Sequence, residues 1–311
     1  MSRYFRELSV VGALTAVLVA MAVLAPGFYQ PQPLLSLATR ETPTLVVACG
    51  MVLVILCRQI DISVGSLFSV CGVSAGLLAA MNWPLALVLV ATIALGAAFG
   101  AVNGVLIAAL RLPSIVVTLA MMVTLRQGLN LVQQGAFVNL PYGLQWFGRS
   151  QSEGQWLLVT FALLLLGALG LGLRHLVAGR MVYAIGSDAE AARLAGIRPQ
   201  LGTFLVFLVM GGLTGLAAVM NMVQSPQVQP LSGNGLELKV IAAVVVGGVA
   251  ISGGRGNVWG AFAGLLLLGC IAPALVHLHI EAYWEKAIQG AIILLAVVAD
   301  SVRPRHPFSA D

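Results

Sequence analysis

The sequence has very little charge. Only 9% of its 311 residues are charged and 59% are hydrophobic, whereas a typical soluble domain carries about 25% charged residues. No soluble fold can cover so much apolar side chain, so we interpret the chain as an integral membrane protein. The alternating, turn-rich pattern of a membrane β-barrel is also missing. Long apolar runs with many glycines and alanines favour packed helices instead.

Lysine is nearly absent. The two lysines, Lys239 and Lys286, do not follow a glycine, so there is no Gly-Lys-Ser/Thr phosphate loop and we expect no ATP hydrolysis by this chain alone. The four cysteines lie in apolar runs without metal-ligand spacing, which is typical of packing residues. His277 and His279 beside Glu281 resemble a weak metal site, but a solvated loop is favoured. We therefore predict no enzyme activity, no catalytic residue, no cofactor, no metal and no nucleic-acid partner.

The apolar residues fall into ten runs long enough to suggest membrane-spanning helices, which need about 20 apolar residues each. The runs are approximately 9–25, 34–57, 62–81, 84–110, 113–134, 156–175, 201–223, 237–252, 257–276 and 282–300. We predict one all-α domain over residues 1–311, a polytopic membrane helical bundle of about 10 transmembrane helices. The short eighth run and the tight joint between the second and third favour a broken or re-entrant span at one of these places.

The basic residues are distributed unevenly between these runs. With the N-terminus inside, eleven fall on the cytoplasmic side and four outside, while Arg126 lies within a span. The outer four are Arg40, Arg149, Lys239 and Lys286. We therefore predict that both termini and the segment 180–200 are cytoplasmic, and that the main outer loops are 135–155 and 225–236.

A short polar helix interrupts the apolar sequence within 180–200. Ser187 and Glu190 have the spacing of a capping box, which predicts that the helix begins at Ser187. Gly196 suits the position after the helix, and Pro199 prevents continuation. Such a helix on a membrane protein indicates a docking point for a soluble partner. A capped interfacial loop without a partner is the alternative.

Two polar turns are expected at the inner surface. Arg58 and Asp61 are three residues apart and can pair if the backbone is helical, and Asp61 or Ser63 can cap the next helix. The second turn is rich in glycine and indicates tight backbone passage rather than phosphate binding. A structural role is favoured over solute contact for the first turn. The inner-turn residues are Arg58, Asp61, Gly65, Gly253, Gly254, Arg255 and Gly256.

Amide side chains gather in the fourth and fifth runs, where hydrocarbon is expected. Gln127, Asn130 and Gln134 recur at helical spacing and define one face. They offer the donors and acceptors that a sugar hydroxyl requires, although hydrogen bonding between helices is the alternative. The candidate pathway residues are Asn103, Thr118, Gln127, Asn130, Gln134 and Asn221. Glu237 and Lys239, which start the eighth run, are expected to anchor at the outer interface or to meet a binding protein.

Several stretches, in order along the chain, together resemble the ribose/arabinose-type permeases of bacterial ABC sugar importers. Residues 58–66, Arg-Gln-Ile-Asp-Ile-Ser-Val-Gly-Ser, are similar to that family's (N/Q)-I-D-(I/L)-S-V-G motif. Asn103-Gly104 with 112–119, the segment 186–197, and the stretches 235–238, 241–248 and 253–256 complete the pattern. The resemblance implies that an ATPase docks on Gly186, Ser187, Asp188, Glu190, Ala191, Ala192, Arg193, Leu194, Gly196 and Ile197.

The resemblance also implies the partners and the mechanism. It implies a multi-pass permease of the bacterial cytoplasmic (inner) membrane, surrounded by membrane lipid. Its partners would be a cytoplasmic ABC ATPase, a second permease that is identical or homologous, and an extracytoplasmic solute-binding protein. Transport would follow alternating access. Residues 126–148 and 283–290 look most like the rhamnose branch, with the autoinducer-2 branch close behind.

Two other classes of function compete with this interpretation. An ion-coupled secondary transporter needs a carboxylate deep in the bundle, and Asp61 is the one good candidate in the sequence. A membrane scaffold without transport is the third class, and the clustered amides argue against it.

Overall fold

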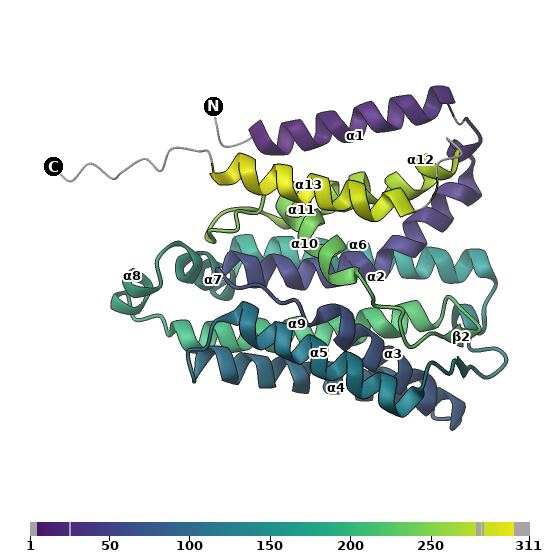
Figure 1. The fold of residues 1–311 in the computed structure, drawn as a ribbon, viewed down its shortest axis with the longest axis horizontal. Coiled ribbons are helices and arrows are strands. Elements are labelled where there is room, and N and C mark those ends of the chain that lie inside the picture. Colours follow the sequence, from purple (N-terminus) through teal and green to yellow (C-terminus); the bar gives the residue numbers. More distant parts are fainter. Residues whose placement is uncertain (1–4, 25, 278–280, 282, 302–311) are drawn as a thin grey trace.

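The computed structural model describes residues 5–24, 26–277, 281 and 283–301. The α-helices are α1 (Phe5–Leu24), α2 (Pro31–Leu56), α3 (Val64–Ala80), α4 (Leu85–Ala108), α5 (Ser114–Gln133), α6 (Gln151–His175), α7 (Val177–Ser187), α8 (Ala189–Leu194), α9 (Pro199–Met222), α10 (Leu236–Val246), α11 (Val258–Gly269), α12 (Ile271–His277) and α13 (Tyr283–Ser301). Two 3-10 turns, η1 (Pro26–Tyr29) and η2 (Gln145–Gly148), and a two-stranded antiparallel ribbon of β1 (Val138–Asn139) and β2 (Gln227–Val228) complete the fold. Most helices run along one axis, with α8 at one end and β2 at the other (Figure 1), which we call the α8 end and the β end.

Six helical segments are long and apolar enough to cross a membrane. They cover residues 31–56, 85–108, 114–133, 151–175, 199–222 and 258–276, and two shorter apolar stretches cover 12–23 and 64–80. Each of the ten predicted apolar runs contains a helix. The helical membrane bundle is therefore confirmed, whereas the count of ten spans and the position of the termini stay predictions.

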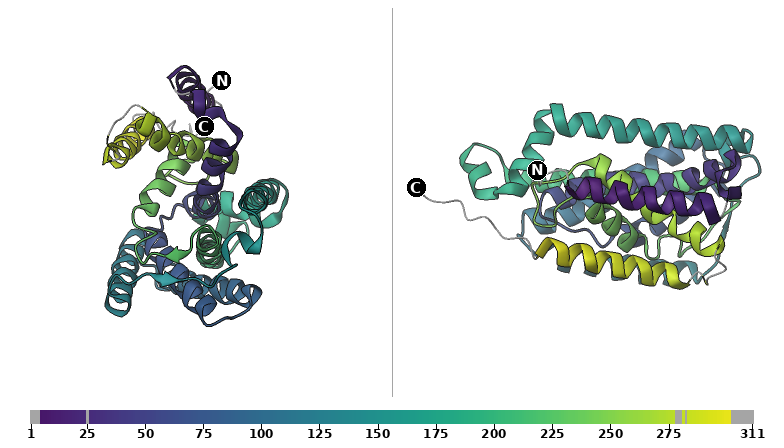
Figure 2. Two further views of the ribbon diagram at one scale, coloured as in Figure 1. Left: turned by 90° about the vertical axis from the view of Figure 1, so that its right-hand side faces the viewer. Right: turned by 90° about the horizontal axis from the view of Figure 1, so that it is seen from above.

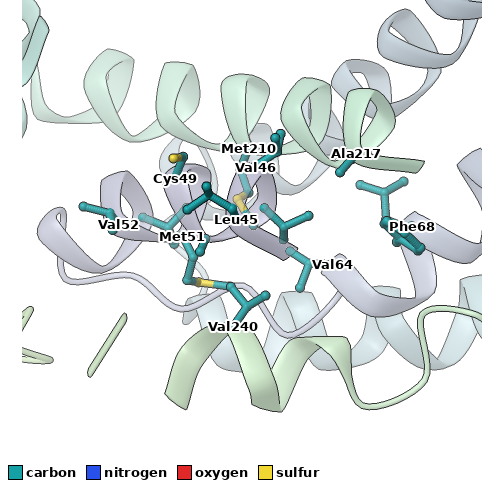
Figure 3. Close-up of a cluster of buried hydrophobic side chains, with 14 of the residues drawn as sticks. Leu45, Val46, Cys49, Met51, Val52, Val64, Phe68, Met210, Ala217 and Val240 are labelled. Atoms are coloured by element: carbon teal, nitrogen blue, oxygen red, sulfur yellow. The ribbon is translucent and has the colours of Figure 1, made fainter. Parts of the chain in front are cut away.

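Helix α2 forms the axis of the bundle and is buried at every residue from Glu41 to Leu56. Figure 3 shows its side chains, Leu45 and Met51 among them, between Met210 of α9, Phe68 of α3 and Val240 of α10. Pro43 lies inside this helix and removes the amide that would bond the carbonyl of Thr39. The hydroxyl of Thr42 donates to that carbonyl at 2.7 Å instead. The central helix therefore keeps this buried carbonyl satisfied despite the proline.

Helices α4 and α9 pack backbone to backbone because glycines face each other. A Cβ on Gly96 would overlap the carbonyl of Gly211, and a Cβ on Gly100 would overlap the carbonyl of Phe207. Gly215 lies just as close to the carbonyl of Thr92. Small residues permit this approach and are a usual basis of helix packing in membranes, where lipid is as apolar as leucine.

Two helices begin midway along the bundle rather than at an end. The backbone turns inward over 57–63 before α3 and over 223–235 before α10 (Figure 1). The 11-residue α10 then runs to the α8 end, while α3 runs to the β end (Figures 1 and 2). Their starting turns touch, because a Cβ on Gly233 would overlap the carbonyl of Gly65. Both tight places noted in the sequence are thus half-helices joined to inward-running backbone.

Candidate functional site

The most prominent projection of the molecule is the pair α7 and α8 with the residues that follow, 177–197, which we call the α7–α8 elbow (Figure 1). The chain bends at Asp188, whose φ of −158° and ψ of 108° are extended. The Asp188 carboxylate accepts hydrogen bonds from the N–H groups of Glu190 at 2.9 Å and Ala191 at 3.0 Å. These bonds hold the pKa of the exposed Asp188 carboxyl below its usual range. Asp188 therefore caps the start of α8.

The predicted capping box of Ser187 and Glu190 is wrong. Ser187 is the last residue of α7, and a Cβ on Gly254 would overlap its hydroxyl oxygen. Glu190 bonds Arg193 at 2.5 Å instead of reaching back to the N-cap amide. The reason is that Asp188 is an equally good cap one residue later, so that α7 can extend through Ser187.

The end of α8 is as the sequence predicts. Gly196 has a φ of +85°, and its N–H bonds the carbonyl of Arg193 at 3.0 Å. The N–H of Ile197 bonds the carbonyl of Ala192 at 3.0 Å, which completes a Schellman motif. Among the residues of α8 only Ala192 is buried, and Leu194 is 81% exposed. Helix α8 thus presents an exposed ridge on which Leu194 is the one large apolar side chain.

The elbow is wedged against the core at a point that we call the glycine junction, formed by Leu56, Gly186 and Gly254. A Cβ on Gly186 would overlap the carbonyl of Leu56, and the N–H of Gly254 bonds the same carbonyl at 2.9 Å. The hydroxyl of Tyr183 donates to the carbonyl of Gly256 at 2.7 Å. The elbow, the end of α2 and the turn at 250–256 therefore form one mechanical unit.

The glycine-rich turn has the tight backbone that the sequence indicates. Gly253, Gly254 and Gly256 all have positive φ, and the carbonyl of Arg255 accepts a bond from Ala250 at 2.9 Å. The side chain of Arg255 is exposed at the α8 end.

Gly65 does not share this location, because it lies at the midway contact of α3 with the turn before α10. Its assignment to an inner turn is therefore wrong.

The predicted pair of Arg58 and Asp61 does not form. Arg58 has a φ of +61°, which breaks the helical spacing that such a pair requires, and its Nε donates to the carbonyl of Ser252. The Asp61 carboxylate accepts bonds from the N–H of Ser63 at 2.9 Å and from its hydroxyl at 2.6 Å. Neither Asp61 nor Ser63 caps the first turn of α3 as expected. The Asp61 carboxylate bonds Ser63 instead, and the Ser63 side chain forms no cap bond.

Two candidate pathway residues hold the inward-running backbone. The Asn103 amide, fully buried, donates to the hydroxyl of Ser63 at 3.0 Å. The hydroxyl of Thr118 is 3.3 Å from the carbonyl of Ile60, and Ser114 accepts from the Ile60 N–H at 3.3 Å. The structure thus places Asn103 and Thr118 where they bind protein backbone or serine. Their contact with a solute stays a prediction.

The other amides lie on the outward side of α5. Gln127 and Gln134 are exposed, and the amide of Asn130 is 3.4 Å from the carbonyl oxygen of Gln127. The opposite side of α5, with Val117 and Leu125, is buried against the bundle. Gln134 ends the helix with a left-handed φ of +48°. Asn221 is half-buried one residue before the end of α9, so it does not belong to the outward face of α5.

Two ion pairs that the sequence analysis missed flank the start of α10. Arg126 of α5 pairs with Glu237 at 3.2 Å, and Lys239 pairs with Glu41 of α2 at 2.7 Å. The partners are 111 and 198 residues apart, so spacing along the chain gives no sign of them. Among these side chains the two carboxylates are the most buried, at 8% and 7% exposed.

The ion pairs lie well inside the bundle. Arg126 is twelve residues from the start of α5, which places it about 18 Å along that helix, and Glu41 lies about 15 Å along α2. Glu237 and Lys239 are therefore paired within the bundle, and the prediction that they anchor at the outer interface or meet a binding protein stays a prediction. Asp61 is also not the one buried carboxylate, because Glu41 and Glu237 are buried as well. No group of three or more histidine, cysteine or acidic side chains able to hold a metal occurs within the described residues, and part of the weak histidine site lies outside them.

Comparison with known proteins places these features in a family. A family model described as "Branched-chain amino acid transport system / permease component" matches residues 34–297. The ribose import permease protein of Escherichia coli (strain K12) is 34% identical over 298 residues, which are 93% of this chain and 92% of that protein. The autoinducer 2 import system permease protein of Enterobacter sp. (strain 638) is 33% identical over 298 residues, covering 95% and 86%. No solved structure was found to match the chain.

The matched residues include the α7–α8 elbow, the polar turn at 57–63 and both buried ion pairs. Six apolar helices of spanning length accompany the match. The chain is therefore a multi-pass membrane protein that belongs to this permease family of ABC importers.

Proposed function

We propose that this chain is the membrane half of an ATP-driven importer that moves a monosaccharide or sugar-like solute into the cytoplasm by alternating access. The observation that carries the proposal is the capped α7–α8 elbow, which projects from the bundle and is wedged into the end of its central helix. A cytoplasmic ABC ATPase docks on α8, so the α8 end and both termini face the cytoplasm. A second permease, identical or homologous, and an extracytoplasmic solute-binding protein complete the importer in the bacterial inner membrane.

The glycine junction gives the docked ATPase a way to act on the membrane core. A rigid displacement of α8 is passed to α7 and then to the end of α2, because no side chain separates Gly186 from the carbonyl of Leu56. The same displacement moves the turn at 250–256 and hence α10, which that turn follows. Movement at the α8 end therefore reaches the middle of the membrane through two connected elements.

The outward face of α5 is the proposed lining of the solute pathway. Gln127 is exposed there beside the apolar side chains of Leu119 and Val123. An amide side chain that faces lipid lacks a hydrogen-bond partner, which is unfavourable. Contact with the second permease and with an aqueous passage supplies hydrogen-bond partners to this face of α5. Amide groups both donate and accept hydrogen bonds, as sugar hydroxyls require.

L-Rhamnose is the favoured solute, because residues 126–148 and 283–290 resemble the rhamnose branch. The relatives named above import ribose and autoinducer 2 according to their names. Autoinducer 2 is therefore the second candidate. Neither is a branched-chain amino acid, although the family model is described as a branched-chain amino acid transport system.

The docking role is tested with Leu194→Asp. Leu194 is 81% exposed, so the variant should fold like the wild type but should no longer retain the ATPase on gentle purification, and sugar uptake should be lost. Tyr142→Asp is the matched control, because Tyr142 is also a fully exposed large side chain but lies near the β end. Full ATPase recovery and uptake with Leu194→Asp would contradict the docking role.

One outcome would favour the ion-coupled alternative. If the wild-type chain purifies without any ATPase and its uptake follows a proton or sodium gradient, the buried carboxylates become the centre of the mechanism. Asp61 is the candidate in that case, since Glu41 and Glu237 are each paired with a basic side chain.

A further inference from the structure

A small polar cluster lies where α3 and α10 begin, midway along the bundle. It consists of Ser66, Arg126, Asn234 and Glu237, and we call it the midway cluster. The Glu237 carboxylate lies against the first turn of α3, since a Cβ on Gly65 would overlap one of its oxygens. Both half-helices therefore direct their N-terminal ends, which carry unpaired N–H groups and partial positive charge, toward one place.

Two buried polar atoms in this cluster have no partner among the described residues. They are the hydroxyl oxygen of Ser66, a residue 3% exposed, and Oε2 of Glu237, a residue 6% exposed. Buried polar groups are normally hydrogen-bonded, so a buried polar atom without a partner needs a physical explanation. The hydroxyl of Ser69, one turn along α3, offers a contrast, because it accepts the N–H of Gly233 at 3.0 Å.

A cavity adjoins Ser66, while Glu237 does not line it and acts on it through its ion pair with Arg126. Ser66, Ser69, Arg126 and Asn234 supply its polar lining, and it has room for about one water-sized group. Asn234 and Leu231 at its margin are exposed, so the cavity communicates with the surface of the chain beside the outward face of α5. A whole sugar does not fit, but a single hydroxyl group does.

The charges select what can occupy the cavity. Arg126 and Glu237 compensate each other at 3.2 Å, so the site holds no net negative charge to attract a cation. An ammonium group would meet the guanidinium of Arg126, and for an anionic group the attraction of that guanidinium is already offset by Glu237. A hydroxyl suits this lining, because it donates to the hydroxyl oxygen of Ser66 and accepts from Arg126.

We propose that the midway cluster is a contact site for a hydroxyl group of a neutral, polyhydroxylated solute during its passage. The proposal rests on the proposed function and gives that pathway a defined contact. It explains why an ion pair and a serine are kept in the middle of a membrane protein. It also assigns the discrimination between neutral sugars and zwitterionic amino acids to the pair of Arg126 and Glu237.

The test uses Ser66→Ala in proteoliposomes that contain the permease with its ATPase and binding protein. D-Ribose, L-rhamnose and autoinducer 2 are the probes, and each imported probe is compared with its monodeoxy forms. In the wild type, removal of the contacting hydroxyl slows import. In Ser66→Ala that ratio of rates should fall several-fold toward one for the same analogue, while the binding protein's own preference cancels from the comparison.

Ser69→Ala is the matched control. Its hydroxyl is already bonded to Gly233, so the change should lower thermal stability and leave every ratio of rates unchanged. Ser66→Ala should unfold at the wild-type temperature, because the lost oxygen has no protein partner. Unchanged ratios in Ser66→Ala, with an importing wild type, would overturn this proposal alone. Failure of the wild type to import any of the three probes would overturn the proposed function and this contact with it.

Discussion

At the scale of single residues, Asp188 determines where α8 begins. Its carboxylate accepts two backbone N–H groups, and these bonds lower its pKa. A lowered pKa in the folded state means that the cap contributes fully above the ordinary value of about 4 and is lost as pH falls through the folded value. We therefore expect the hydrogen-exchange protection factors of the Glu190 and Ala191 amides to stay constant from pH 5 to 8 and to fall only in stronger acid.

Two substitutions separate the cap from the charge. Asp188→Ala should speed exchange at these amides at neutral pH, whereas Asp188→Asn should keep them protected because asparagine caps equally well. The asparagine variant should also lose the acid sensitivity. Equal exchange in the alanine variant and the wild type would show that packing alone orders α8.

Residue types along the chain predicted the elbow but not its partners. Gly196 and Pro199 mark the end of α8 through local backbone rules that need no tertiary contact. Ser187 and Asp188 are adjacent good caps, and the choice between them depends on Gly254, which is distant in sequence. For the same reason, local sequence rules could not predict the ion pair of Arg126 with Glu237, because the two residues are 111 residues apart.

At the scale of elements, the glycines between α4 and α9 set the separation of the two helices. Gly211→Ala should destabilise the protein by about 1–3 kcal/mol, since the added methyl overlaps the carbonyl of Gly96 and the helices must move apart. Gly212→Ala is the control, because its Cβ would meet Ala97 at an ordinary 3.8 Å. Thermal unfolding in detergent gives the comparison. A stability loss of the same size in both variants would trace the effect to the helix itself rather than to the contact.

Apolar runs predicted every long helix, because a helix that crosses hydrocarbon requires a long run of apolar residues. The short eighth run and the tight joint after the second run indicated a broken or re-entrant span at one place, but not that both α3 and α10 begin midway along the bundle. The backbone at 57–63 runs inward because Asn103, Ser114 and Thr118 satisfy its polar groups. Those side chains come from α4 and α5, and two of them, Asn103 and Thr118, are pathway candidates by sequence alone, because the sequence does not show that the fold brings them to this turn.

At the scale of the whole molecule, the bond from Tyr183 to Gly256 ties the elbow to the turn that precedes α11. Tyr183→Phe removes a hydrogen bond worth about 1 kcal/mol without changing the shape of the side chain. We expect normal ATPase binding and hydrolysis but fewer solute molecules imported per ATP, because part of the movement no longer reaches α10. Tyr142→Phe, an exposed tyrosine, is the control. An unchanged ratio of import to hydrolysis would contradict this route.

The pairing of Glu41 with Lys239 has a consequence for biosynthesis. The lysine is made 198 residues after the carboxylate, which at about 5–20 residues per second is a delay on the order of 10–40 s. During that interval the nascent α2 carries a carboxyl group whose folded-state partner does not yet exist. A ribosome that stalls before α10 therefore leaves Glu41 and Arg126 in the membrane core without Lys239 and Glu237, the partners that both of them have in the folded chain.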